Sequence, residues 1–158
     1  MEAQYSPIQI EEKWSKIWAD RELEKPGSAD HFSQIIPPPN VTGTLHMGHS
    51  FQYAIMDFYT RYHHMNGTDS YWQVGTDHAG IATQMVVENN LLNEGKSKDG
   101  LGREKFLEEV WKWKDYSEGE ISAQMKRLGI TVEWDKYRFT YDYDFCKGVN
   151  KAFVELYR

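Results

Sequence analysis

Two histidines and two glycines lie close together in the segment "PPPNVTGTLHMGHS", residues 37–50. His46 and His49 are three residues apart, so at the start of a helix both imidazole rings can lie on one face. The free N–H groups and the positive dipole end of a helix N-terminus suit phosphate. Two imidazole N–H groups there could also stabilise charge that develops on a phosphoryl group.

The small and rigid residues of this segment fit the same chemistry. Gly43 and Gly48 would let a flat base or a phosphate approach the backbone. Pro37, Pro38 and Pro39 stiffen the chain and lack N–H groups, so their carbonyl oxygens could accept from a ligand's cation. A His-x-x-His pair is also common as surface decoration, and it could be half of a metal site. From spacing alone, a phosphate, a metal and no ligand all remain open.

A second polar cluster, "GTDHAG" at residues 75–80, follows the next predicted strand. Ligands of doubly wound sheets bind at the carboxyl ends of the strands, so both clusters are expected at one edge. The Asp77 carboxylate could pair with an ammonium group, or it could cap the helix predicted from Ala79. His78 could cap, bind or be merely exposed.

The elements that must position these clusters alternate between strand and helix. The predicted strands span residues 31–36 and 70–75, and the predicted helices span about 47–64, 79–92 and 103–128. We expect an irregularity near Gly119, a short strand at 130–134, and a C-terminal helix with Val149, Phe153 and Leu156 on one face. This order predicts an α/β domain with a parallel sheet and crossover helices.

A helix is also expected ahead of the first strand. Ser6 and Gln9 have the spacing of a capping box around Pro7, and the helix would pack on the outside of the domain. We therefore divide the chain into an N-terminal helical extension, residues 1–30, and an α/β domain, residues 31–158.

Composition places the chain among folded globular proteins. Of 158 residues, 40% are hydrophobic and 15% aromatic, and the net charge is −6, without a basic block that would indicate general nucleic-acid binding. One cysteine excludes an internal disulfide framework. Without a signal sequence or an apolar stretch of membrane-spanning length, we expect a soluble cytoplasmic protein that is not attached to a membrane.

Together the two clusters resemble the class I aminoacyl-tRNA synthetases. "HMGH", residues 46–49, is similar to the family's His-Ile-Gly-His motif, with Met47 at the second position. "GTDHAGIATQ" resembles the valine-specific members, because the isoleucine and leucine enzymes usually carry Gly-Trp-Asp at its start. "GREKFLEEVWKWK" and "QMKRLGITVEWD" also fit the valine enzymes, so the resemblance covers nearly the whole chain.

The resemblance implies a Rossmann-type catalytic domain and a reaction. Valine and ATP, taken with Mg²⁺, would give valyl-adenylate, and the valyl group would pass to tRNA(Val). No protein ligand for Mg²⁺ is assigned. His46 and His49 would be catalytic and contact the ATP phosphates; Pro37 and Asp77 would hold the ammonium group of valine, and Pro38 would wall its side-chain pocket. The other residues expected at ATP or the adenylate are Asn40, Thr42, Gly43, Thr44 and Gly48.

The resemblance also implies parts that these 158 residues lack. The family carries a lysine-rich Lys-Met-Ser-Lys-Ser-type loop, an editing domain that hydrolyses tRNA mischarged with threonine, and an anticodon-binding domain. We therefore expect an N-terminal fragment that ends near the start of the editing insertion, with very weak activity alone. A free-standing ATP- and amino-acid-binding module, or an inactive paralogue with an interaction role, is the alternative.

Overall fold

The computed structural model describes residues 6–19 and 29–158. Five helices and four strands occur in these ranges, together with one turn of 3₁₀ helix at Trp134–Lys136. The helices are α1 (Pro7–Ala19), α2 (Met47–Met65), α3 (Gly80–Asn93), α4 (Lys98–Leu128) and α5 (Tyr143–Tyr157). The strands are β1 (His31–Ile35), β2 (Asp69–Gln73), β3 (Gly75–Thr76) and β4 (Arg138–Phe139).

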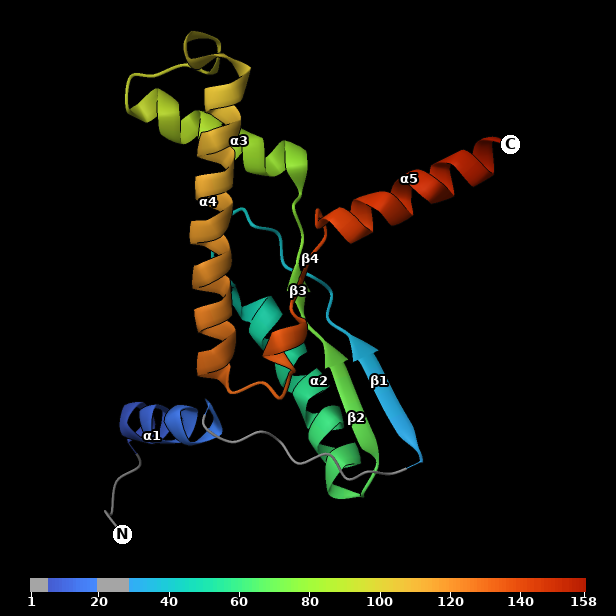
Figure 1. Ribbon diagram of the computed structural model, residues 1–158. Helices are drawn as coiled ribbons and strands as arrows, with labels where there is room; N and C mark the ends of the chain where they lie inside the picture. Colours follow the sequence, from blue (N-terminus) through green and yellow to red (C-terminus); the bar gives the residue numbers. More distant parts are fainter. Residues whose placement is uncertain (1–5, 20–28) are drawn as a thin grey trace.

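The sheet has the predicted parallel arrangement. β1 and β2 pair in parallel, from His31 opposite Asp69 to Ile35 opposite Gln73, and α2 makes the crossover between them (Figure 1). β3 continues the path of β2 and pairs in parallel with β4. The predicted α/β class, with parallel strands and crossover helices, is therefore confirmed.

The core lies where α2 and α4 meet these strands. Tyr53 of α2 and Trp72 of β2 are fully buried and make an edge-to-face ring contact, with centroids 6.4 Å apart. Around them gather Ile36, Val74, Ile121, Met125, Ile130 and Val132. A smaller apolar cluster joins α3 to α4 through Val87, Leu91 and Phe106.

Two details of the predicted elements are wrong. The irregularity expected near Gly119 is absent, because Gly119 lies inside continuous helix. The break lies instead at Gly102, whose positive φ of 75° separates a short helical stretch that begins at Lys98 from the helix predicted from about residue 103. Residues 130–134 do not form a strand; the backbone there is irregular and leads into the 3₁₀ turn. The pairing strand is instead β4, four residues further on. Ile130 and Val132 are buried without strand pairing, so the alternation of apolar and polar residues there resembles that of a strand.

The two terminal helices lie on the outside. α1 contacts α4 through the Glu11–Arg127 ion pair at 3.2 Å, and the guanidinium of Arg61 lies 5.1 Å from the centre of the Trp18 ring. α5 projects away from the other elements in Figure 1, and its predicted apolar face is exposed. The rest of the predicted N-terminal extension lies mostly outside the described residues. Among the described helices, none is long and apolar enough to cross a membrane.

Candidate active site

The two polar clusters meet through their backbones. The Val41 N–H donates to the Asp77 carbonyl at 3.0 Å, and the Asp77 N–H donates to the Pro39 carbonyl at 2.8 Å, which makes a parallel bridge between Asn40 and Asp77. The segment after β1 and the segment after β3 therefore run side by side, as predicted. The expectation that all three proline carbonyls are free is wrong for Pro39, whose carbonyl is used in this bridge.

The predicted histidines cap the helix that they begin. His46 is the N-cap residue of α2, and its Nδ1 accepts from the Gly48 N–H at 3.1 Å. The His46 N–H in turn donates to Nδ1 of His49 at 3.2 Å, which completes a capping box made of two histidines. The two rings stack with centroids 3.9 Å apart. Sequence spacing predicted the shared face but not the capping.

These hydrogen bonds set the protonation pattern of both rings. A ring nitrogen that accepts a hydrogen bond carries no proton, so each neutral imidazole has its proton on Nε2. Burial, with a smaller contribution from neighbouring His46, lowers the pKa of His49 from its usual 6.5 and favours the neutral form. No described residue bonds either Nε2–H group. The pair therefore offers two donors beside the positive end of the α2 dipole.

The two predicted glycines differ in what requires them. A Cβ on Gly48 would lie 2.8 Å from Cε1 of His46, so Gly48 makes room for the capping ring. A Cβ on Gly43 would meet nothing within 4 Å. Packing within the described chain therefore explains Gly48, whereas no described neighbour requires a glycine at position 43.

Helix α4 holds the loop between β1 and α2 at three points, which the sequence did not reveal. Trp113 donates from its indole N–H to the Val41 carbonyl at 2.9 Å, and Ser117 donates from its hydroxyl to the Gly43 carbonyl at 2.9 Å. The Leu45 N–H donates to the side-chain oxygen of Gln124 at 2.8 Å. The three α4 positions are four and seven residues apart, so they share one face of the helix. That spacing was the available signal.

The Asp77 carboxylate uses one of its two oxygens within the fold. Oδ1 accepts from the Ala79 N–H and from the Thr140 hydroxyl, each at 3.0 Å, and lies 3.3 Å from Nδ1 of His78. Oδ2 has no hydrogen bond to a described residue. The N-cap residue of α3 is Ala79, so the capping alternative for Asp77 is wrong in its strict form, although its carboxylate still accepts from the helix start.

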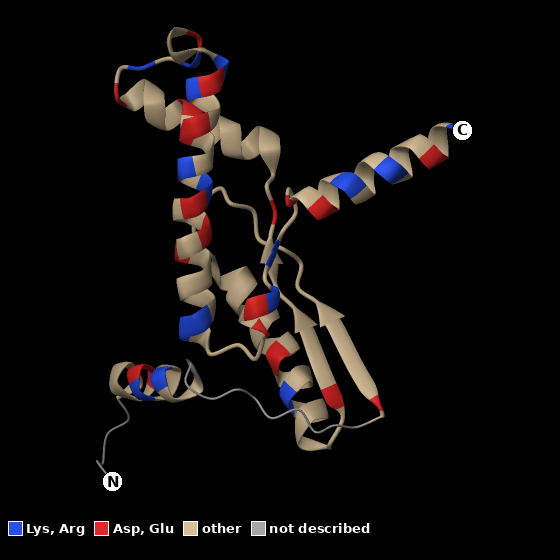
Figure 2. Ribbon diagram, in the orientation of Figure 1, with Lys and Arg blue, Asp and Glu red and all other residues tan. Residues whose placement is uncertain are grey.

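The remaining predicted residues surround this pair of loops. Pro37, Pro38, Asn40 and Thr44 are exposed, and Thr42 is half-buried. No side-chain hydrogen bond within the described residues occupies the amide of Asn40 or the hydroxyls of Thr42 and Thr44. Residues 31–56 contain no Lys, Arg, Asp or Glu, and the connection from β1 into α2 is correspondingly uncoloured in Figure 2. Dipoles and imidazoles, rather than basic side chains, would meet an anion here.

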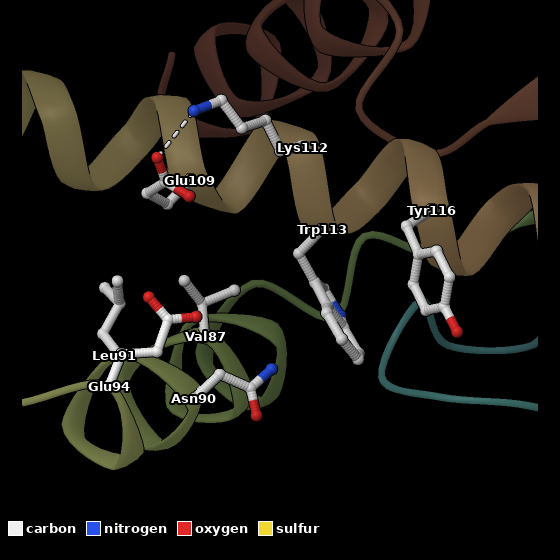
Figure 3. A pocket seen from close by; sticks show the side chains of 8 residues that line it. All are labelled: Val87, Asn90, Leu91, Glu94, Glu109, Lys112, Trp113 and Tyr116. Carbon is white, nitrogen blue, oxygen red and sulfur yellow. Dashed lines mark hydrogen bonds and ion pairs between the residues drawn. The ribbon is translucent and has the colours of Figure 1, made fainter.

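A cavity of about 240 Å³ lies beside the loop, between α3 and α4 (Figure 3). α3 and the residue after it contribute Val87, Asn90, Leu91 and Glu94, and α4 contributes Glu109, Lys112, Trp113 and Tyr116. None of the predicted site residues lines it. Trp113 connects the two places, because it lines the cavity and also holds Val41.

A parallel strand pair with a crossover helix and an open helix N-terminus is the arrangement of α/β nucleotide-binding domains. The family model described as tRNA synthetases class I (I, L, M and V) matches residues 9–158, so the chain belongs to this family.

Individual relatives agree with that assignment. The chain is 52% identical over 154 residues to the valine–tRNA ligase of Acinetobacter baylyi, and the match covers 97% of this chain and 16% of that protein. It is 50% identical to the valine–tRNA ligases of Dechloromonas aromatica and Legionella pneumophila. The chain thus spans about a sixth of the length of these relatives.

A solved structure supports the fold. The LeuRS of the LeuRS–tRNA–LeuAMS ternary complex from Agrobacterium radiobacter matches with a TM-score of 0.69 at 20% identity. The match covers 98% of this chain and 18% of that one.

Proposed function

We propose that this chain forms the ATP- and valine-binding part of a valine–tRNA ligase. In the reaction, the carboxylate of valine attacks the α-phosphate of ATP to give valyl-adenylate and pyrophosphate. The valyl group then passes to the 3′ end of tRNA(Val). The observation that carries the proposal is the backbone bridge between Asn40 and Asp77, because it sets the two loops side by side.

Each loop supplies groups suited to one reactant. Nε2–H of His46 and of His49 would donate to the phosphate oxygens, where negative charge grows as pyrophosphate leaves. Gly43 would give the nucleotide access to the backbone. Oδ2 of Asp77 would accept from the ammonium group of valine together with the carbonyl of Pro37, and Pro38 would wall the side-chain pocket.

The adenylate would be completed by neighbouring contacts. Asn40, Thr42 and Thr44 have the hydrogen-bonding side chains that we propose for the nucleotide. Magnesium would arrive with the ATP phosphates; within the described residues no group of three or more His, Cys, Asp or Glu could hold a metal ion. A cytoplasmic location stays a prediction.

Valine-dependent exchange of pyrophosphate into ATP tests the proposal in the complete gene product. We expect the double variant His46→Ala, His49→Ala to lower kcat more than it weakens valine binding, because both donors act on the phosphates. Asp77→Ala should instead raise the KM for valine and leave that for ATP nearly unchanged.

Matched controls come from the same chain. His64→Ala changes a half-buried histidine at the far end of α2, and Asp135→Ala changes an exposed carboxylate. Both should exchange like the unchanged protein. A complete gene product that shows no valine-dependent exchange would contradict the proposed reaction, and a histidine double variant that changed only the valine KM would contradict the phosphate role.

A further inference from the structure

We propose that Thr140 is a positioning residue that fixes the Asp77 carboxylate for the ammonium group of the amino acid. This inference rests on the proposed function, and it adds a residue from the turn between β4 and α5. The Thr140 hydroxyl donates to Oδ1 of Asp77 at 3.0 Å, across 63 residues of sequence. Neither the polar clusters nor their spacing pointed to this residue.

The hydroxyl of Thr140 is fully used. It has one proton and two lone pairs. The proton goes to Asp77, one lone pair accepts from the His78 backbone N–H at 2.9 Å, and Nδ1 of His78 lies 2.7 Å from the same oxygen. Since the hydroxyl has no second proton, Nδ1 of His78 must donate. Three neighbouring groups thus hold the hydroxyl oxygen of Thr140. With its proton on Nδ1, His78 has the opposite tautomer from His46 and His49, whose protons are on Nε2.

The backbone of Thr140 is held as firmly as its side chain. Its N–H donates to the Thr76 carbonyl at 3.1 Å, next to Asp77 in the chain. Thr76 is fully buried, and its hydroxyl accepts from the Tyr137 phenol at 2.9 Å and donates to Glu118 at 3.0 Å. A Cβ on Gly75 would lie 2.2 Å from the Arg138 carbonyl oxygen. The glycine therefore lets β4 approach closely enough for Thr140 to reach the carboxylate.

This arrangement has a consequence for ligand binding. The terminal torsion of an aspartate is broad, so an unrestrained carboxylate samples many orientations. Thr140 and the Ala79 N–H hold Oδ1, and Oδ2 is left for the ligand. Without the hydroxyl, the ligand itself must order the carboxylate, and we expect valine binding to weaken about tenfold or more, an effect of the order of one hydrogen bond to a charged group. The affinity for valine should therefore decrease, whereas the affinity for ATP should not.

The test compares Thr140→Val, which keeps the shape and removes the hydroxyl, with Thr140→Ser, which keeps the hydroxyl. Pyrophosphate exchange by the complete gene product gives the KM for valine and for ATP. For Thr140→Val we expect the valine KM to rise about tenfold or more and the ATP KM to change less than about threefold. Thr140→Ser should restore the valine KM to within about threefold of the unchanged protein.

A second readout separates positioning from a general loss of structure. 2-Hydroxy-3-methylbutanoate replaces the ammonium group of valine with a hydroxyl, and its inhibition constant reports binding without that charge. Thr140→Val should bind valine more weakly and this analogue nearly as before, which reduces the discrimination between them. Thr131→Val is the matched control, because Thr131 is half-buried and its hydroxyl bonds no described residue.

The outcomes distinguish the two proposals. If the protein without substitutions shows no valine-dependent pyrophosphate exchange, both the proposed function and the role of Thr140 are wrong. An active protein in which Thr140→Val keeps the original valine KM overturns the role of Thr140 alone. Equal increases in both KM values with a lowered Tm, not restored by Thr140→Ser, would also overturn positioning and indicate a structural role.

Discussion

Replacing His46 with asparagine should separate its capping role from its proposed catalytic one. Asparagine is among the best N-cap residues, so His46→Asn keeps a side-chain acceptor for the Gly48 N–H. It has no group that corresponds to the imidazole Nε2–H. His46→Ala removes the acceptor and the donor together, and both variants lose the ring stacking on His49.

The expected magnitudes follow from these contacts. Removing an N-cap side chain costs about 1 kcal/mol, so His46→Ala should be less stable than His46→Asn by about that amount. Removing one preorganised donor to developing negative charge lowers kcat by about 10²–10³. Because both variants lack the donor, both should show this loss, and kcat should not follow stability.

Urea unfolding measures the stability difference, and valine-dependent pyrophosphate exchange in the complete gene product measures kcat. Two results would refute the reasoning. If His46→Asn kept full activity, the ring would be needed only to cap α2. If both variants were equally stable, the hydrogen bond between Gly48 and His46 would contribute nothing measurable.

Further predictions concern packing, burial and pH. Gly43→Ala should change the free energy of unfolding by less than about 0.5 kcal/mol, because the added Cβ meets open space. The same variant should weaken ATP binding measured by calorimetry. Unchanged ATP affinity would exclude a close approach of the nucleotide to the backbone at Gly43. Tyr53→Phe should stabilise the protein by about 1 kcal/mol, measured by urea unfolding, because the buried Tyr53 hydroxyl has no hydrogen-bond partner in the described part of the chain. A clear loss of stability would show that the hydroxyl does have a partner. The pKa of His49 is lowered in the folded state, so below about pH 6.5 the unfolded chain binds a proton that the folded chain resists. Stability should therefore fall as the pH drops through this region, His49→Gln should remove that part of the decrease, and an unchanged pH profile in His49→Gln would assign the effect elsewhere.

Local patterns were enough to predict the elements that carry the two loops. The start of α2 at Met47 and the parallel pairing of β1 with β2 follow from an apolar stretch, a polar turn and a helical repeat in that order. Long-range contacts were not accessible in this way. Ser117 is a small polar residue in a helix, and only the folded structure shows that it is buried and that its hydroxyl donates to the Gly43 carbonyl. β4 has two residues, too few for any alternation, so Thr140 carried no recognisable signal.

Three of the side chains proposed to bind ligand, those of His46, His49 and Asp77, share one property, which decides how they must be studied. Each has two polar atoms and uses one of them in the fold: Nδ1 in His46 and His49, and Oδ1 in Asp77. The second atom, Nε2 or Oδ2, is thereby oriented and left for ligand, because the first bond restricts rotation of the ring or carboxylate. An alanine substitution removes both atoms, so a loss of activity after it does not distinguish binding from local folding. Replacements that keep a hydrogen-bond acceptor in place of the first atom and remove the second atom, such as His46→Asn, make that distinction.

Asp77→Asn makes the same distinction for the carboxylate. If the amide oxygen takes the place of Oδ1, the amide nitrogen takes the place of Oδ2, meets the ligand's ammonium group and repels it. We expect this variant to fold like the unchanged protein, as judged by urea unfolding, and to bind valine far more weakly; valine binding at the original strength would show that Oδ2 does not contact the ammonium group.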